Sequence, residues 1–267
     1  MPPISNSPPE RSWLDTAKST YTVVYNAVEP AVSYPLSVLP YEVKLGVLVL
    51  GTVGATLATG KMYKRFIKRI PNADAVSPEE VAKRRWIKGV VTSVGDADNF
   101  RLYHTPGIGW RWPLKFRFIP KTTKELKDQT IHIRMAGADA PEAAHFGKEA
   151  QPYAAEALAW LRGYVLEKRI WCQMVHKDQY GRIVAVPMLP TIIPFRYRNV
   201  SLEMIRAGWA TVYEQSNAVY GKEGKARYLA IEATAKSARR GMWEKGVDGE
   251  TPAAYKKRHA AATASKG

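Results

Sequence analysis

Residues 131–142 read IHIRMAGADAPE, an alternating segment that ends in turn residues and acids. Every second residue from Ile131 to Met135 is apolar, which predicts a strand that packs one face into a core. Gly137 and Pro141 favour turns, so the strand is expected to end between them. We interpret the rest of the chain as built around this strand and the loop that follows it.

Charged side chains gather at the end of this predicted strand. Arg134 leaves the strand on the face opposite the apolar residues, and Asp139 and Glu142 follow in the loop. A guanidinium and two carboxylates in this arrangement can act together on a phosphate group. They can also form an ordinary surface ion pair at a strand-to-loop corner, and this stretch alone favours that simpler interpretation.

Length and charge narrow the class of protein. The chain has 267 residues, enough for one well-packed domain with tails or for two small domains. Its net charge of +16 and pI of about 9.8 favour an anionic partner, such as nucleic acid or an anionic membrane surface. The single cysteine, Cys172, excludes an intramolecular disulfide, and the five scattered histidines offer no zinc-site spacing. Any bound metal is therefore expected to have oxygen ligands.

The first part of the chain predicts a membrane anchor. Residues 1–40 are rich in proline and are expected to form a disordered arm. Residues 45–60 carry no charge and span about 24 Å as a helix, and Lys44 and Lys61 can extend this toward the roughly 30 Å of a hydrocarbon core. We expect a single transmembrane helix over residues 41–63; a buried helix of a soluble protein is the alternative. The cations that follow the helix favour a cytosolic or equivalent side for the C-terminal body.

The remainder of the chain predicts a domain of strands and helices. A basic linker over residues 64–85 comes first, and a disordered basic tail is expected over residues 247–267. Alternating apolar patterns predict strands over residues 86–94, 99–104, 114–118, 131–135, 169–176 and 182–188.

Helical periodicity predicts three helices in the same domain. One follows Gly147, a second is capped by Asn199 or Ser201 and stops at Gly208, and a third passes through Tyr228 with Gly241 as its C′ residue. The economical packing of these elements over residues 86–246 is an α+β fold. We expect a five-stranded OB-type β-barrel with three helices, preceded by the single transmembrane helix.

Three separated segments carry acids and arginines in a specific order. They are Asp96-Ala97-Asp98 in the first hairpin turn, Arg134 with its two following acids, and residues 178–182 (DQYGR) in a later turn. In order and spacing the chain resembles the staphylococcal-nuclease (thermonuclease-like) family over roughly residues 86–246. With its proline-rich arm and single span, the whole chain resembles the fungal membrane-anchored probable endonucleases assigned to mitochondria.

The resemblance implies an activity and a set of functional residues. Members of the family cleave phosphodiester bonds in DNA and RNA with Ca²⁺, and the resemblance implies a mitochondrial membrane as the location. It places catalytic roles on Arg134, Glu142 and Arg182, and metal ligation on Asp98, Asp139 and the backbone carbonyl of Ala140.

The sequence departs from the commonest family pattern at three positions. Ala97 stands where glycine is usual, Asn99 where threonine or serine is usual, and Ala140 where threonine is usual. The change at Ala140 has little effect if only the backbone carbonyl of this residue binds the metal. Ala97 matters more, because a tight turn often requires the backbone freedom of glycine.

The chemistry of these side chains agrees with the implied roles. Carboxylates suit Ca²⁺, whose flexible shell also accepts a carbonyl and water. A positioned base such as Glu142 contributes on the order of 10² to 10⁴ in rate. Arginine forks bind phosphoryl oxygens in a way that lysine does not reproduce.

Several of these residues have a simpler interpretation. Asp98 is also a good turn former, and Arg182 is also acceptable as a surface residue of a strand. Tyr180 and Tyr213 are candidates to stack on a base or hold a phosphate, and packing explains both equally well. The alternative function is therefore a catalytically silent OB-type module that binds nucleic acid or protein.

Overall fold

The structure is a computed structural model that describes residues 22, 40–144, 149–215, 217–246 and 251–264. The chain divides into two compact units, residues 1–63 and 64–267. The predicted arm over residues 1–40 lies almost entirely outside the described residues.

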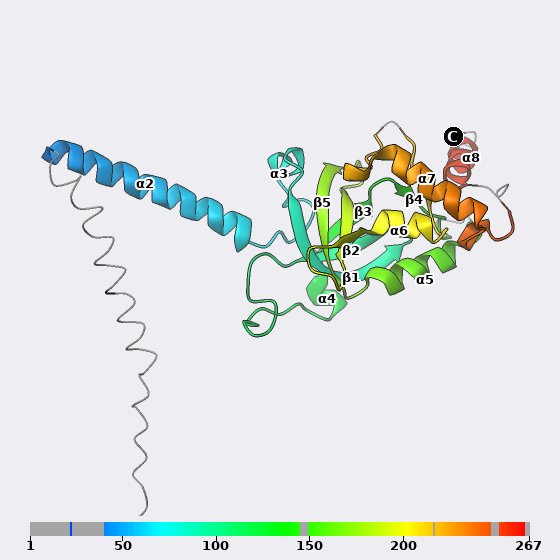
Figure 1. Ribbon diagram of the computed structural model, residues 1–267, viewed down its shortest axis with the longest axis horizontal. Coiled ribbons are helices and arrows are strands. Elements are labelled where there is room, and N and C mark those ends of the chain that lie inside the picture. The colour runs from blue at the N-terminus through cyan, green and yellow to red at the C-terminus, as the bar shows by residue number, and fades with distance from the viewer. Residues whose placement is uncertain (1–21, 23–39, 145–148, 216, 247–250, 265–267) are drawn as a thin grey trace, which may run out of the picture. The chain divides into compact units, whose positions relative to one another are not determined.

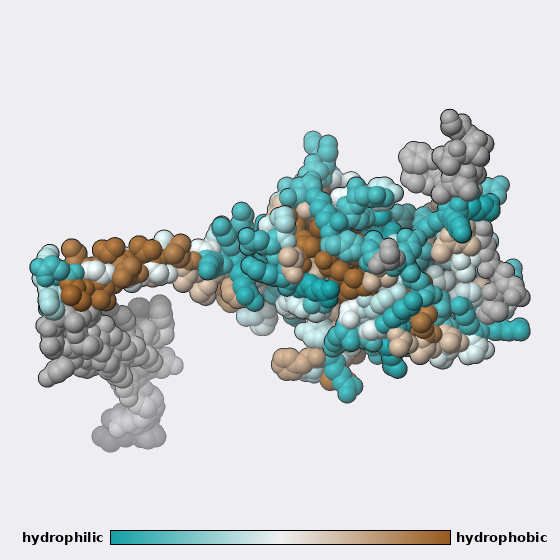
Figure 2. Space-filling model, turned by 90° about the horizontal axis from the view of Figure 1, so that it is seen from above, coloured by the Kyte–Doolittle hydropathy of each residue, from teal (hydrophilic) through white to brown (hydrophobic). Residues whose placement is uncertain are grey.

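The N-terminal unit is dominated by helix α2, Tyr41–Phe66, which has 26 residues and buries none of them. Its mean hydropathy of 1.6 over 18 residues makes it long and apolar enough to cross a membrane, by length and composition only. Figure 2 shows the apolar side chains along it. The hydroxyls of Thr52, Thr56 and Thr59 donate to carbonyls one turn back in the helix, which satisfies them without water.

The second unit contains a closed five-stranded barrel (Figure 1). Its strands are β1 (Trp86–Asp96), β2 (Asn99–His104), β3 (Ile131–Met135), β5 (Arg169–Lys177) and β6 (Ile183–Pro190). The neighbours run β3-β2-β1-β5-β6, and β3 then pairs in parallel with β6 to close the ring. The predicted α+β fold with a five-stranded barrel is confirmed. Two small additions are β7 (Tyr197–Asn199) on β6, and the pair β4 (Ala138–Asp139) and β8 (Thr211–Val212).

Apolar side chains fill the barrel and join it to the helices. Phe100, Ile133 and Met174 are completely buried, as the alternating patterns predict. Figure 1 shows helices α5 (Ala154–Val165), α6 (Val200–Arg206) and α7 (Gly224–Ser237) beside the barrel. Shorter helices are α3 (Pro78–Ala82), α4 (Thr123–Leu126) and the 3₁₀ turns η1 (Gly221–Glu223) and η2 (Gly241–Trp243). Of the two predicted caps of α6, Asn199 or Ser201, the structure has Asn199, whose side chain accepts hydrogen bonds from the backbone amides of Ser201 and Leu202.

The predicted strand over residues 114–118 is wrong. The segment is a loop in which the amides of Phe116 and Arg117 both donate to the carbonyl of Gly109. Leu114, Phe116 and Phe118 are exposed. The barrel has no position for this segment, because β3 already pairs with both β2 and β6.

The predicted C′ residue of α7 is also wrong. Arg239, rather than Gly241, follows the helix with a left-handed φ of 48°, and the Arg240 amide donates to the Ala235 carbonyl. Gly241 has a different constraint, because a Cβ there would lie 2.5 Å from the Gly208 carbonyl oxygen.

The chain after residue 247 differs from the disordered tail that we expected. Helix α8 spans Pro252–Ala264, and Tyr255 on it is buried. The Tyr255 hydroxyl donates to the Glu149 carbonyl at 2.5 Å, which attaches α8 to the barrel domain.

Two glycines give a test of the barrel packing. A Cβ at Gly89 on β1 would lie 2.4 Å from the Tyr103 carbonyl oxygen, so Gly89→Ala is expected to cost about 1–3 kcal/mol. A Cβ at Gly163 on α5 meets no atom within 4 Å, so Gly163→Ala is expected to add about 1 kcal/mol through helix propensity. Chemical denaturation measures both variants. Equal stability of the two would contradict this packing of β1 against β2.

Candidate active site

Arg134, on β3, lies at the centre of a group of charged side chains from several segments. Its Nη1 lies 2.9 Å from Asp98 Oδ2, and its Nη2 lies 3.6 Å from Asp139 Oδ1. Asp98 comes from the turn between β1 and β2, which is held against β3 by the Met135 amide donating to the Asp98 carbonyl. Asp139 comes from β4, immediately after β3. One guanidinium therefore joins two buried carboxylates from two different segments.

The electrostatics of this group follow from burial and charge. Burial disfavours the charged form of Arg134, but Asp98 and Asp139 outweigh it and raise the pKa of the guanidinium above its ordinary value. Burial also raises the pKa of the Asp139 carboxyl, although Lys256 and Arg134 act in the opposite direction. Asp98 Oδ2 is fully buried, and its contact with Arg134 is an ion pair without a well-directed hydrogen bond. This oxygen therefore has a lone pair available for a cation.

The departures from the family pattern in the first turn are accommodated. Ala97 is buried and is not among the described residues with a positive φ, so this turn does not require glycine. The side-chain Nδ2 of Asn99 donates to Asp96 Oδ2 at 2.8 Å and to Asp98 Oδ1 at 3.2 Å. The Oδ1 of Asn99 lies 3.0 Å from His132 Nε2. Asn99 thus orients the Asp98 carboxylate.

Arg182 is held by the turn between β5 and β6. The Asp178 carboxylate accepts hydrogen bonds from the Tyr180 and Arg182 amides and from Arg182 Nε at 2.7 Å. Burial acts to raise the pKa of Asp178, but the bonds from Arg182 outweigh it and lower the pKa. Gly181 has a φ of +76°, which lets the turn close within this hydrogen-bonded loop. The Arg182 guanidinium lies 5.1 Å from the centre of the Tyr180 ring.

Glu142 stands on a loop that a second hydrogen-bond pair fixes. Its amide donates to Gln151 Oε1 at 3.3 Å, and its carbonyl accepts from the Gln151 amide at 2.9 Å. The Glu142 side chain is 40% exposed. Of the loop that follows, residues 145–148 lie outside the described residues.

A cavity of about 930 Å³ brings together the predicted catalytic residues and the two tyrosines, but the three predicted metal ligands do not line it. Its lining includes Arg134, Glu142, Arg182, Tyr180 and Tyr213. Two of the predicted metal ligands, Asp98 and Asp139, reach this group through their ion pairs with Arg134. The third, Ala140, is buried and directly follows Asp139.

Lys256 is the residue that sequence reasoning missed. Helix α8 carries its ammonium to 2.5 Å from Asp139 Oδ1 and 2.8 Å from Glu142 Oε1. Burial disfavours the charge of Lys256, but Asp139, Asp98 and Glu142 outweigh it and raise the pKa. Lys256 and Asp139 are 117 residues apart, so no local spacing could predict the contact.

The donor set fits a hard divalent cation in part. Among the described residues, no three His, Cys, Asp or Glu side chains gather closely enough to hold a metal by themselves. Asp98 and Asp139 nevertheless offer only oxygen atoms as ligands. The ammonium of Lys256 already pairs with both Asp139 and Glu142, which shows that a cation fits beside these carboxylates. Two carboxylates, a backbone carbonyl and water form a set that Ca²⁺ accepts.

Comparison with known proteins identifies the family. The family model described as staphylococcal nuclease homologue matches residues 132–245. "Probable endonuclease LCL3" of Schizophyllum commune is 62% identical over 205 residues, which are 75% of this chain and 70% of that protein. The chain belongs to the staphylococcal nuclease family. As a member of it, the protein is a nuclease, a hydrolase that acts on ester bonds.

Further relatives carry the same printed name. The protein of Sclerotinia sclerotiorum is 46% identical over 210 residues, which are 77% of this chain and 78% of that protein. The protein of Paracoccidioides lutzii is 48% identical over 223 residues, which are 80% of this chain and 63% of that protein. The matched part therefore spans less than two thirds of the Paracoccidioides relative.

The hydrogen bonds to Asp178 predict a pH-dependent contribution to stability. Asp178→Asn removes the charge that accepts from Arg182, so the variant is expected to be about 1–2 kcal/mol less stable at neutral pH. Because the folded pKa of Asp178 is lowered, this difference is present above the unfolded pKa of about 3.9 and is lost as pH falls through the folded pKa. Chemical denaturation of both proteins across this range measures it. A difference that persists unchanged at the acid end would contradict the assignment.

Proposed function

We propose that this protein is a membrane-anchored, Ca²⁺-dependent endonuclease that hydrolyses phosphodiester bonds of DNA, RNA or both. The observation that carries the proposal is the common cavity, in which the guanidiniums of Arg134 and Arg182 and the carboxylate of Glu142 lie near the buried pair Asp98 and Asp139. The family supports the nuclease activity. The specific roles below are our interpretation of the geometry.

The two arginines are assigned to the phosphoryl group. Hydrolysis adds negative charge to the phosphoryl oxygens in the transition state, and fixed cationic donors stabilise that charge. Arg182 uses its Nε for Asp178, so its two Nη groups are the ones proposed to reach the phosphate. Arg134 is held by carboxylates on both Nη groups, which fixes its guanidinium before substrate arrives.

Glu142 is assigned as the general base. It lines the cavity and its side chain is partly exposed, so its carboxylate can accept a proton from a water molecule that lies beside a bound phosphate. The clamp between its backbone and Gln151 keeps the carboxylate at the cavity. Tyr180 and Tyr213 line the same cavity and are proposed to contact the nucleotide; the Tyr213 ring lies 5.5 Å from the Arg134 guanidinium.

Calcium is proposed to bind between Asp98, Asp139 and the Ala140 carbonyl. When bound there, it supplies positive charge to neutralise the phosphate and to orient the attacking water. Lys256 pairs with Asp139, which is one of the proposed ligands, so its ammonium and a metal ion would compete for that carboxylate. We propose that Lys256 balances the charge of Asp139 and Glu142 in the metal-free protein.

Helix α2 is proposed to anchor the protein in a membrane. Its length, its uncharged centre and its internally bonded threonines support this assignment. A mitochondrial membrane is proposed as the location on the basis of the family resemblance.

A nicking assay tests the catalytic assignment. Glu142→Gln and Arg182→Ala are each expected to lower Ca²⁺-dependent plasmid nicking by about 10² or more while the fold is retained. Arg101→Ala is the matched control, because Arg101 is an exposed arginine on the barrel and does not line the cavity. Circular dichroism checks the fold of each variant.

Two outcomes would contradict the proposal. Unchanged nicking by either site variant removes the mechanism. No nicking by the unmodified chain, with calcium or with excess chelator, favours the catalytically silent binding module instead.

The role of Lys256 has its own test. Lys256→Met removes the ammonium and keeps most of the side-chain length, so calcium affinity is expected to rise about tenfold, or 1.4 kcal/mol. Lys257→Met is the control, because Lys257 is the exposed neighbour on α8. Isothermal titration of the full chain with calcium measures both. Unchanged or weaker affinity in Lys256→Met would show that the ammonium and the metal do not compete.

A further inference from the structure

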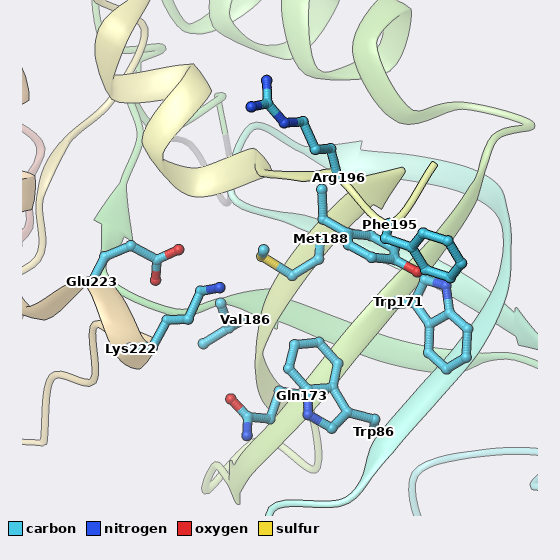
Figure 3. A pocket seen from close by; sticks show the side chains of 10 residues that line it. Trp86, Trp171, Gln173, Val186, Met188, Phe195, Arg196, Lys222 and Glu223 are labelled. Carbon is cyan, nitrogen blue, oxygen red and sulfur yellow. The ribbon is translucent and has the colours of Figure 1, made fainter. Parts of the chain in front are cut away.

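A second pocket, of about 570 Å³, lies on the outer face of the barrel (Figure 3). Four aromatic side chains line it: Trp86, Trp171, Phe195 and Tyr197. We call it the aromatic pocket. The catalytic assignment uses none of these residues.

Both the side chain and the backbone of Phe195, which lines this pocket, are energetically unfavourable. Its side chain is 96% exposed, although it is large and apolar. Its backbone has a φ of 61°, a left-handed conformation that costs a bulky residue free energy. An exposed aromatic ring held in a strained conformation beside a pocket suggests a function for that ring.

The aromatic pocket lies along the same strand, β6, as the cavity lined by Arg134, Glu142 and Arg182, which we call the catalytic cavity. Val184 lines the catalytic cavity, while Val186 and Met188 line the aromatic pocket. Alternate residues of a strand share one face at about 3.3 Å per residue, so Val184 and Met188 are about 13 Å apart. Together with Ala136 these three residues form one apolar cluster outside the barrel, against which Trp171 packs. A strand of nucleic acid extending from the scissile phosphate would reach the pocket within a few nucleotides.

Cations surround the aromatic pocket. Arg196 and Lys222 line it with a single acid, Glu223, and Lys88 Nζ lies 5.6 Å from the centre of the Trp171 ring. A neighbouring cavity of about 1070 Å³ shares Arg196 with the pocket. Its lining also contains four further cations and no carboxylate; the cations are Arg111, Lys168, Arg169 and Arg198. Such a surface is complementary to a polyanion.

We propose that the aromatic pocket binds unpaired bases of a single-stranded nucleic acid whose scissile phosphate lies in the catalytic cavity. The aromatic rings supply stacking surfaces, which accept any base, and the flanking cations hold the backbone phosphates. Only unpaired bases expose their faces to such rings, so the site selects single strands over duplex. This inference rests on the proposed function, because it assumes that the bound strand has its scissile phosphate in the catalytic cavity.

Oligonucleotide binding by the full-length protein in detergent, with chelator to prevent hydrolysis, tests this site. Phe195→Ala is expected to weaken the affinity for a labelled oligothymidylate dodecamer about fivefold or more. The affinity for a duplex of the same length is expected to change less than about twofold, because its bases are already stacked. Phe118→Ala is the matched control, an exposed phenylalanine on another loop that does not line the pocket. Fluorescence anisotropy gives each dissociation constant.

Salt dependence gives a second readout. Arg196→Ala is expected to reduce the slope of log affinity against log salt concentration by about 1, because one phosphate contact is removed. Arg101→Ala is expected to leave the slope unchanged.

Each remaining outcome overturns the inference. Unchanged affinity in Phe195→Ala, equal losses for dodecamer and duplex, or an equal loss in Phe118→Ala would each exclude a base-stacking site in this pocket. An equal loss in both phenylalanine variants would indicate a general apolar surface, such as one that meets lipid. The nicking assay tests the proposed function separately. If the protein binds the dodecamer through Phe195 but does not cut plasmid DNA, the catalytic assignment is wrong and the base-binding site stands.

Discussion

The parallel pairing of β3 with β6 is the constraint on which both the barrel and the site depend. In this register Arg134 lies opposite Val184, and Ile133 and Met135 lie opposite Ile183 and Ala185. The pairing closes the sheet, so that five strands enclose one core. It also brings the segment of Arg182 beside the segment of Arg134, although nearly fifty residues separate them in the chain. A barrel left open at this seam would expose its core and separate the two arginines that line the proposed active-site cavity.

Charge balance is the second organising feature of the site. Asp98 and Asp139 are buried, and an isolated buried carboxylate is costly, so each has a cation at short range. Arg134 serves both, and Lys256 serves Asp139 and Glu142. Residues from the β1–β2 turn, from β3, β4 and the loop after β4, and from α8 thus depend on one another.

The sequence predicts those features that local patterns encode. Period-two alternation identifies β3 and the strands that surround it, and the polar residues Asn199 and Ser201 indicate the start of α6, where Asn199 is the cap. The same alternation over residues 114–118 is misleading, because apolar residues also alternate in an exposed loop and only the closed ring shows that no strand fits there. The role of Asn99 follows from contacts to Asp96 and His132, which no spacing reveals. The contact of Lys256 with Asp139 depends on how α8 packs, and the composition of its segment suggests disorder instead.

Arg134 and Arg182 are proposed to bind one phosphate beside a cation held by Asp98 and Asp139. A crystal structure of the Glu142→Gln variant with calcium and a bound dinucleotide would test it most directly. The account predicts a phosphate between the two guanidiniums, with the metal on the two aspartates and Lys256 displaced from Asp139. A phosphate bound outside this cavity, or a metal bound without either aspartate, would contradict it.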